Sequence, residues 1–350
     1  MLNVIPHSEP DRWNAIVKSY NNWDIYYLCE YAVSFQHHGD GEPLLIQYES
    51  NDASLCYVVM KRDISNDTKF EGRLEPGRYY DFETPYGYGG PLSDAPILEA
   101  VQSGFLSELK EYTNENGVVS QFVRFHPLLA NHESLPQVFE TRYLHQTIFI
   151  ETTSPDQIMT DMDSKNRNMV RKAKKNGVTI ERKNIEEYLD FLPIYEETMV
   201  RDDADDYYFF KEDYFREQSN LKDNSCFFYA MLDNKPIAGA IMYYNDNYMH
   251  YHLAGTHTEY RKYSPSNLLI YEAACWASKQ GIKKFHLGGG MVEDDNLFGF
   301  KKQFNKNGRL PFYVGRTIFD SDDYNYLLNL RKKLDSSFDT DNNRMTQYRY

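Results

Sequence analysis

Three predicted strands in a row, separated only by tight turns, constrain the fold of this chain more than any other feature. Residues 226–232, 236–244 and 248–255 are short runs rich in aromatic and aliphatic side chains. Asn and Asp dominate the two connections, as expected for hairpin turns. Because connections this short join neighbouring antiparallel strands, this region is predicted to fold as an antiparallel meander.

The stretches on either side of the meander add helices and three further strands. Ser154 followed by Pro155 is typical of a helix start, and one long helix is expected from there to about residue 175. A second helix, residues 264–280, leads into a strand at 283–287. The other expected elements are a strand at 178–182, helices at 186–200, 211–221 and 296–304, a strand at 312–319 and a helix at 322–334.

The first half of the chain shows a reduced version of the same plan. Its predicted elements are helices at 11–20, 27–38 and 95–112 and strands at 44–49, 54–61, 79–83, 118–125 and 146–151. The length of 350 residues suits two domains. We therefore predict two α/β domains, residues 1–152 and residues 153–350, of which the second is the more complete.

Composition narrows the class of protein. The net charge of -14 argues against DNA as a partner, although a local basic patch can still hold a phosphate-bearing ligand. Four widely spaced cysteines indicate neither a disulfide framework nor a zinc site, and His250 and His252 lack a third ligand, so no metal is expected. No run approaches the roughly 18 to 20 apolar residues of a membrane span, and no signal peptide is evident, so the cytoplasm is expected.

One basic stretch stands out from this acidic background. Six cations fall within eleven residues: Lys165, Arg167, Arg171, Lys172, Lys174 and Lys175. Arg167 and Arg171 are four residues apart, so both face one side of a helix and can clamp a phosphate. The alternative is a solvated helix end whose cations favour the C-terminal dipole.

Four segments occur in an order that carries a family resemblance. They are the loop 86–92, the basic stretch 164–180, the strand, loop and helix of 251–280, and the Gly-rich 285–290 followed by 297–304. Together they resemble the Fem transferases, tandem GNAT enzymes that add amino acids to peptidoglycan precursors. The resemblance is firmest over residues 160–305. It implies two GNAT-like domains, each a mixed, mainly antiparallel sheet flanked by helices, the first of them degenerate.

The resemblance also places a donor site. In GNAT enzymes that use acetyl-CoA, amides of a glycine-rich turn hold the pyrophosphate at a helix N-terminus. The corresponding stretch here, Arg261 to Ser266, lacks both glycines, and Pro265 has no amide hydrogen. This departure fits an aminoacyl-tRNA better than acyl-CoA as co-substrate, and both stay open. Arg261, Ser264 and Ser266 are the expected donor-binding residues, and no tightly bound cofactor is expected.

Further roles follow from the same resemblance. Lys301 aligns with the family's lysine near the transferred aminoacyl ester, where a fixed ammonium stabilises a tetrahedral oxyanion; otherwise it is a surface lysine on an amphipathic helix. Tyr251, His252 and an acid such as Glu293 are candidates for taking the proton of the attacking amine. The expected acceptor-binding residues are Arg201, Tyr207 and Tyr208, although the loop between them carries four Asp.

The function expected from these residues is acylation of an amine on a cell-envelope precursor, nucleotide- or lipid-linked, by direct attack on an activated ester. Charged tRNA is a candidate partner. Two alternatives stay open: an acyl-CoA-dependent N-acyltransferase acting on an amino sugar or polysaccharide intermediate, and a catalytically silent duplicate that binds an envelope precursor. The expected location is the cytoplasm, including the inner face of the membrane, and monomer, homodimer and heterodimer all stay open.

Overall fold

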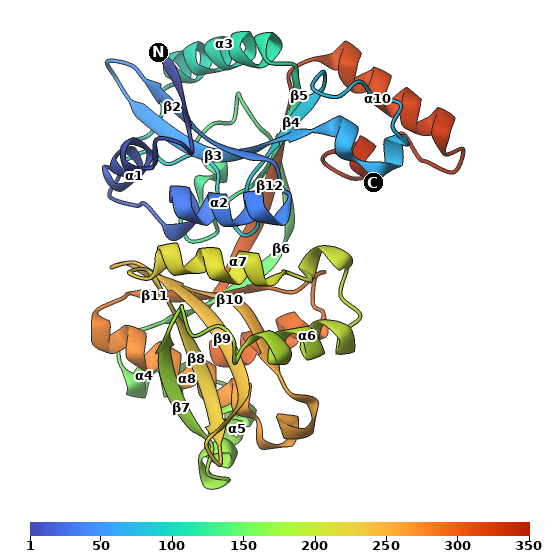
Figure 1. Cartoon of the computed structure of the whole chain (residues 1–350). Helices are drawn as coiled ribbons and strands as arrows, with labels where there is room; N and C mark the ends of the chain where they lie inside the picture. Colours follow the sequence, from blue (N-terminus) through green and yellow to red (C-terminus); the bar gives the residue numbers. More distant parts are fainter. The chain divides into compact units, whose positions relative to one another are not determined.

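The computed structural model describes all 350 residues, and their contacts divide the chain into two compact units (Figure 1). Unit 1 consists of Met1–Leu144 and Phe312–Tyr350, and unit 2 is His145–Pro311. The chain passes between the units at two places, within β6 (Glu140–Glu151) and within β12 (Arg309–Ile318). No helix is long and apolar enough to cross a lipid bilayer.

Unit 1 is a mixed sheet with strand order β1-β2-β3-β4-β5-β12. Its strands are antiparallel except for the parallel pair β4 and β5. Strand alternation divides β2 between two faces: Leu44, Ile46 and Tyr48 join the core under α3, while α2 covers the other face (Figure 1). The bounds are β1 Leu2–Pro6, β2 Glu42–Glu49, β3 Ser54–Asp63, β4 Tyr80–Glu83, β5 Val118–Arg124, α1 Pro10–Lys18, α2 Cys29–His38, α3 Glu99–Glu115 and α10 Ser321–Leu334.

The C-terminal segment belongs to unit 1, which differs from the expected division into residues 1–152 and 153–350. Val314–Ile318 of β12 pair antiparallel with Ser120–Arg124 of β5, so this strand extends the sheet of unit 1. The final residues then return to the same unit, where Arg349 contacts the buried Asp81. Sequence pattern locates a strand but does not name its partner, because pairing joins residues that are far apart in the chain.

In unit 2 the mixed sheet has the strand order β6-β11-β10-β9-β8-β7. The predicted meander is present as β8, β9 and β10, and the only parallel pair among these strands is β10 with β11. The bounds are β7 Thr179–Asn184, β8 Ser225–Leu232, β9 Lys235–Tyr244, β10 Tyr248–Thr256, β11 Lys284–Gly289, α4 Pro155–Asp161, α5 Ser164–Lys175, α6 Leu192–Arg201, α7 Glu212–Glu217, α8 Pro265–Gln280 and α9 Asn296–Lys301.

The single long helix expected from residue 155 to residue 175 is two helices. α4 ends before Met162, which has an extended backbone and is fully buried in the core of unit 2. α5 then starts at Ser164. Burying the Met162 side chain requires the chain to turn there, and a continuous helical pattern in the sequence does not reveal that turn.

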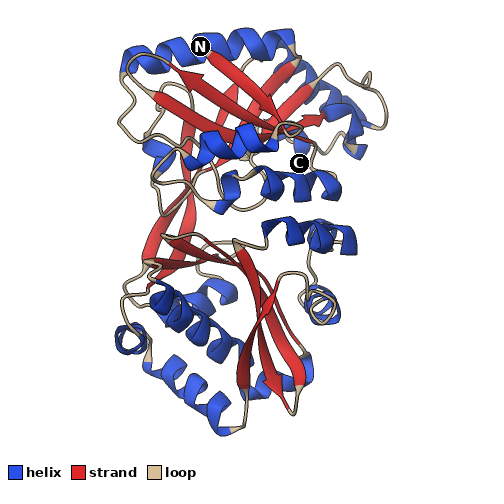
Figure 2. Ribbon diagram, turned by 60° about the vertical axis from the view of Figure 1, so that its left-hand side comes forward, coloured by secondary structure: helices blue, strands red, loops and turns tan.

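Two layers of helices enclose the sheet of unit 2 (Figure 2). α4, α5 and α8 pack on one face and bury the main apolar core, while α6 lies against β9 and β10 on the other. β10 and β11 pair only from Tyr248–His250 to Lys284–His286. Beyond that point β11 stays with β6, and the register of β10 against β9 shifts, so the two parallel strands diverge.

Candidate functional site

A cavity of about 760 Å³ lies in unit 2, where β10 and β11 diverge. Four parts of the chain line it: the end of α6, the last half of β10, the turn that begins α8, and the loop and helix that follow β11. Its wall combines Arg201 and Arg261 with two carboxylates, Asp202 and Asp295. A cavity with charged groups of both signs and an apolar lining is the usual form of a small-ligand site.

The N-terminus of α8 forms one side of the cavity. Ser264 has the left-handed backbone conformation (φ 59°), and Pro265 begins the helix. The Ser266 hydroxyl is hydrogen-bonded to the Thr256 hydroxyl at 2.7 Å, which ties α8 to the end of β10. A helix N-terminus attracts anionic groups, although Pro265 supplies no amide hydrogen here. The three residues expected to bind the donor, Arg261, Ser264 and Ser266, all line this cavity.

The last turns of α6 hold the end of β10. Glu197 accepts a hydrogen bond of 2.7 Å from the backbone amide of Thr258. One turn further on, Arg201 Nη1 donates to the carbonyl oxygen of Thr256 at 2.7 Å, and its Nε donates to Asp202 Oδ1 at 2.9 Å. Arg201, one of the expected acceptor-binding residues, lines the cavity, and its charge is balanced by the neighbouring Asp202.

Tyr251 and His252 are neighbours on β10, but only Tyr251 lines the cavity. His252 is hydrogen-bonded through Nε2 to the Tyr214 hydroxyl of α7 at 2.7 Å. Successive side chains of a strand point to opposite faces, which separates the two residues. Burial, with a smaller effect of His250, lowers the pKa of His252 to about 3, so its imidazole is neutral and a weak base. Burial raises the pKa of Tyr251, which keeps its phenol protonated.

Lys301, the last residue of α9, is buried and only 8% exposed. Its Nζ donates to the carbonyl oxygen of Gly289, at the end of β11, at 2.7 Å. Burial lowers the pKa of Lys301 to about 8, while Asp295 acts in the opposite direction. The alternative of a surface lysine is therefore wrong: Lys301 is an interior cation anchored to the strand that leads into the cavity-lining loop.

Asp295 organises that loop. Its carboxylate accepts hydrogen bonds from the backbone amides of Met291 (2.6 Å), Val292 (3.2 Å) and Phe298 (2.7 Å), and so caps α9. Gly290 packs so closely against the Asp295 carboxylate that a Cβ added to Gly290 would stand 2.0 Å from Oδ1 of Asp295. Asp295, Thr256 and Phe300 line the cavity but were not among the residues predicted. An Asp one residue before a helix is the one sequence signal that pointed to Asp295.

Six of the predicted site residues do not line the cavity: His252 and Lys301, described above, and Arg167, Arg171, Tyr207 and Tyr208. Arg167 donates to the carbonyl oxygen of Met162, and Arg171 donates to Asn168 Oδ1 at 3.2 Å, so the two guanidinium groups have different partners rather than one. Tyr207 and Tyr208 form a short 3-10 turn.

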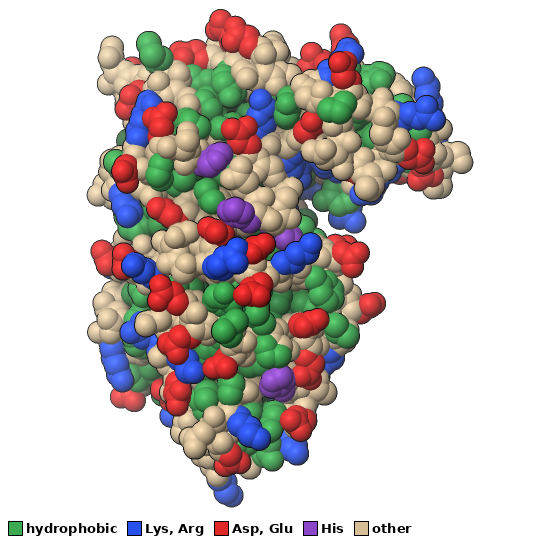
Figure 3. All heavy atoms as spheres, in the orientation of Figure 1, with side chains coloured by type: hydrophobic (Ala, Val, Ile, Leu, Met, Phe, Trp, Pro, Cys, Tyr) green, Lys and Arg blue, Asp and Glu red, His purple; other side chains and the backbone are tan.

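On the face of the molecule shown in Figure 3, acidic and basic side chains are interspersed.

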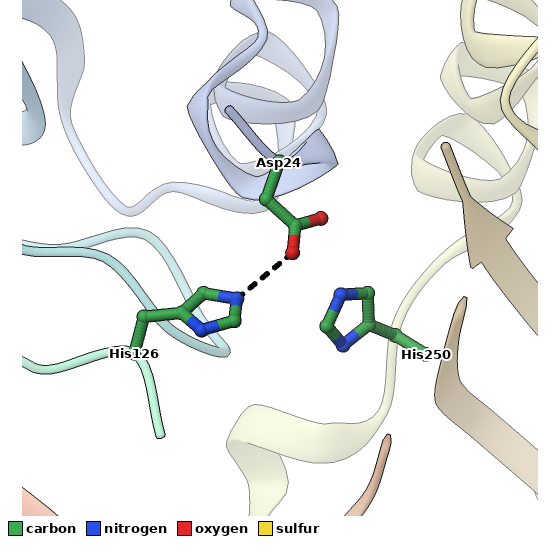
Figure 4. Close-up of side chains that lie close together, drawn as sticks. All are labelled: Asp24, His126 and His250. Atoms are coloured by element: carbon green, nitrogen blue, oxygen red, sulfur yellow. Dashed lines mark hydrogen bonds and ion pairs between the residues drawn. The ribbon is translucent and has the colours of Figure 1, made fainter. Parts of the chain in front are cut away.

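A buried pair in unit 1 supports the loop 86–92. Oδ2 of Asp24 lies 2.9 Å from Nε2 of His126, and both side chains are fully buried (Figure 4). The backbone amide of His126 donates to Asn131, whose side-chain amide donates in turn to the carbonyl oxygens of Gly89 and Pro91. The loop 86–92, one of the segments that resemble the Fem transferases, is therefore held in place by a chain of buried polar groups.

Comparison with known proteins identifies the class of this chain. Residues 163–302 match the family model described as an acetyltransferase (GNAT) domain. All the residues that line the cavity lie within this range. The protein is an acyltransferase. Over nearly its whole length it has the Fem-like tandem GNAT fold, so the predicted fold class is confirmed.

Three solved structures illustrate this likeness. The crystal structure of FemX is 14% identical, covers 93% of this chain and 99% of its own, and has a TM-score of 0.67. A conserved protein of unknown function from Bacteroides thetaiotaomicron is 12% identical (91% and 100% covered, TM-score 0.58). L-PGS from Bacillus licheniformis is 11% identical (95% and 97% covered, TM-score 0.55). No curated protein matches the chain in sequence.

Proposed function

We propose that this protein is a Fem-like aminoacyl or acyl transferase that acylates an amine of a cell-envelope precursor of the peptidoglycan type. The observation that carries the proposal is the cavity at the diverging strands of the GNAT domain, where the N-terminus of α8, Arg261 and Tyr251 meet. The resemblance of its motifs to the Fem transferases supports the envelope precursor as acceptor. The site of action is the cytoplasm, and the precursor is nucleotide- or lipid-linked.

The reaction is a direct transfer. The amine nitrogen attacks the carbonyl carbon of the ester, a C–N bond forms, and the carbonyl oxygen becomes a tetrahedral oxyanion. The C–O bond to the leaving group then breaks, and the proton released by the amine passes to that oxygen or to water. Tyr251 lines the cavity as a neutral phenol and can donate a hydrogen bond to the oxyanion or the leaving oxygen. Lys301 supplies a buried positive charge to the same region through its position beside Gly289.

His252 is not proposed as the base. Its imidazole has a pKa lowered to about 3 and is engaged with Tyr214, so it takes up a proton poorly at neutral pH. We propose that Arg201 contributes to acceptor binding, because it lines the cavity while being held by Thr256 and Asp202. Arg167, Arg171, Tyr207 and Tyr208 are left outside the proposed site.

An acyl-CoA-dependent N-acyltransferase is the second candidate function. The placement of the α8 N-terminus and the Ser266 hydroxyl at the cavity favours it, because a CoA diphosphate binds at such a terminus. Ser264 and Pro265 weigh against it, since they replace a glycine turn whose amides would all be available.

A panel of donors separates these functions. Transfer to a nucleotide-linked muropeptide is measured with charged tRNA and with acetyl-CoA, and the melting temperature is measured with each. Transfer from charged tRNA alone supports the aminoacyl reaction, and transfer from acetyl-CoA alone supports the second candidate. Melting-temperature shifts with the precursor but no transfer from any donor would favour a silent binding protein instead.

Arg261→Ala is expected to raise the KM for the donor by about 5- to 20-fold with a small change in kcat. The guanidinium lies at the α8 turn, and a charged hydrogen bond to a phosphate is worth about 1.5 to 3 kcal/mol before solvent screening. Lys262→Ala, one residue away and outside the cavity lining, is the control and should leave KM unchanged. Equal effects of both variants would show that only general charge is involved.

A further inference from the structure

The β11–α9 loop presents a single carboxylate, that of Asp295, to the cavity. The neighbouring acids of this loop, Glu293 and Asp294, are exposed and are not part of the cavity wall. Beside Asp295 the wall is formed by Asn296 and by the apolar side chains of Met291, Leu297 and Phe300. A carboxylate beside apolar side chains retains more of its attraction for a cation than a carboxylate in open solvent.

The carboxylate is held in a set position and in its ionised form. Both oxygens are oriented by backbone amides, and Gly290 leaves room for Oδ1 where any side chain would collide with it. Burial alone would raise the pKa of Asp295, but the amides of Phe298, Val292 and Met291 lower it. An acid of this kind is a poor acceptor of a proton, yet it keeps its charge for binding a cation.

The charges of the remaining wall give the cavity two different regions. Arg201 is paired with Asp202, and the buried Lys301, which interacts with Asp295, donates to Gly289 and is not part of the wall. The wall therefore has an anion-attracting part, Arg261 and the α8 N-terminus, and a cation-attracting part, Asp295. A plain acyl group carries no charge that Asp295 can recognise. An aminoacyl ester of a nucleotide carries phosphate at one end and an ammonium next to the ester carbonyl.

We propose that Asp295 is a specificity-determining residue that binds the α-ammonium of an aminoacyl donor. This inference rests on the proposed transferase function and adds a reason for preferring aminoacyl over acyl donors. The bound ammonium belongs to the donor rather than to the acceptor, because the attacking amine must be unprotonated when it forms the C–N bond.

The test compares two donors, one with this charge and one in which an added acetyl group has removed it. One is bulk tRNA charged with a mixture of amino acids, and the other is the same preparation N-acetylated so that the ammonium is lost. Uncharged tRNA gives the background. The wild-type protein should bind the first preparation about 5- to 20-fold more tightly than the second, as for a charge-assisted contact of about 1 to 2 kcal/mol.

The variants then assign that preference to one residue. Asp295→Asn retains an oxygen that can cap α9 but removes the charge, and its preference should fall to within about 2-fold. Asp294→Asn makes the same chemical change one residue away, at a left-handed position (φ 55°) that Asn tolerates, and should keep the wild-type preference. Gly290→Ala keeps the charge but displaces the carboxylate, and should also lose the preference.

The outcomes separate this inference from the proposed function. Unchanged binding of N-acetylated tRNA by Asp295→Asn would show that its cavity is still formed, so that a lost preference reflects charge. An Asp295→Asn variant that keeps the full preference would overturn the role of Asp295 while leaving the transferase function standing. Wild-type protein that binds acetyl-CoA but neither tRNA preparation would also overturn it, and binding of no donor would overturn both proposals.

Discussion

Lys301→Met is expected to reduce transfer by at least about 100-fold while making the protein more stable at pH 7. Loss of the buried positive charge removes stabilisation of the oxyanion, and a single such group contributes about 10²- to 10³-fold. The pKa of Lys301 is lowered from 10.5 to about 8, so burying the ammonium costs on the order of 3 kcal/mol. Loss of its hydrogen bond to Gly289 offsets part of this, which leaves a net gain of about 1 to 2 kcal/mol.

The pH dependence of this gain has a defined sign. Between pH 8 and pH 10.5 the unfolded chain binds a proton at Lys301 that the folded protein has released, so wild-type stability rises with pH across this window. The Met variant lacks this rise. Its advantage should therefore be full below pH 8 and disappear between pH 8 and pH 10.5, and above that range the wild type should be the more stable protein, because the burial cost of about 3 kcal/mol is then gone while the hydrogen bond to Gly289 remains. Chemical unfolding of both proteins at pH 7, 9 and 10.5 measures the difference in their free energies of unfolding at each pH.

Two further variants make the assignment to Lys301 specific. Lys302→Met changes the next residue of the chain and should alter neither transfer nor stability appreciably. Lys301→Arg retains a cation at high pH, so any transfer it supports should not decline above pH 8 as the wild-type rate is expected to do. A Lys301→Met protein with normal transfer, or one that is less stable at pH 7, would contradict the role of a buried functional cation.

Asp81→Asn is expected to destabilise unit 1 by about 3 kcal/mol, because it removes the charge of a fully buried carboxylate that the guanidinium groups of Arg62 and Arg349 share, while each guanidinium keeps one further carboxylate partner. Asp81 is 1% exposed. Its carboxylate accepts hydrogen bonds from Nε of Arg62 at 2.8 Å and from Nε of Arg349 at 2.6 Å. The Tyr348 hydroxyl donates to the same carboxylate at 3.0 Å. This cluster fastens the C-terminal residues to β4, so the variant should also expose the C-terminus to carboxypeptidase.

Low pH should also reduce the stability of the wild-type protein. Burial alone would raise the pKa of Asp81, but Arg349 and Arg62 outweigh it and lower the pKa from 3.8 to about 2. The stability that this group contributes is therefore complete above about pH 3.8 and is lost as the pH falls through about 2. Urea unfolding from pH 6 to pH 2 should show a smaller loss in Asp81→Asn than in the wild type.

Glu140→Gln is the matched control for the ion pair of Asp81. Glu140 pairs with Arg316 in unit 1, but its side chain is 65% exposed, so the expected loss is below about 1 kcal/mol. Similar losses in the two variants would mean that burial does not distinguish the two ion pairs.

Much of the architecture was predictable because it depends on local patterns. The tight turns at residues 233–235 and 245–247 identified the meander, and Pro265 and Gly281 marked the two ends of α8. Helix and strand periodicity failed where burial of one side chain mattered more than continuity, as at Met162. It also assigned residues 312–350 to the second domain, although β12 pairs with β5.

The candidate site was predictable only in part. Arg261, Ser264, Ser266, Arg201 and Tyr251 came from sequence resemblance and lie together at the cavity. Arg167 and Arg171 have the spacing of a clamp, yet spacing along a helix does not say what the helix faces. Asp295 escaped notice because its one sequence signal, an Asp just before a helix, predicts a helix cap and does not show that the carboxylate faces a cavity.

The sequence by itself determined the element types, the tight turns, the two-domain plan and the chemical groups available for acyl transfer, because these depend on residues close together in the chain. The tertiary structure decided which of those groups share a cavity, that Lys301 is buried, and that Tyr251 and His252 face opposite sides of β10. Pairing and burial bring together residues that are far apart in the chain. For this reason pKa values and the composition of the cavity wall follow only from the folded protein.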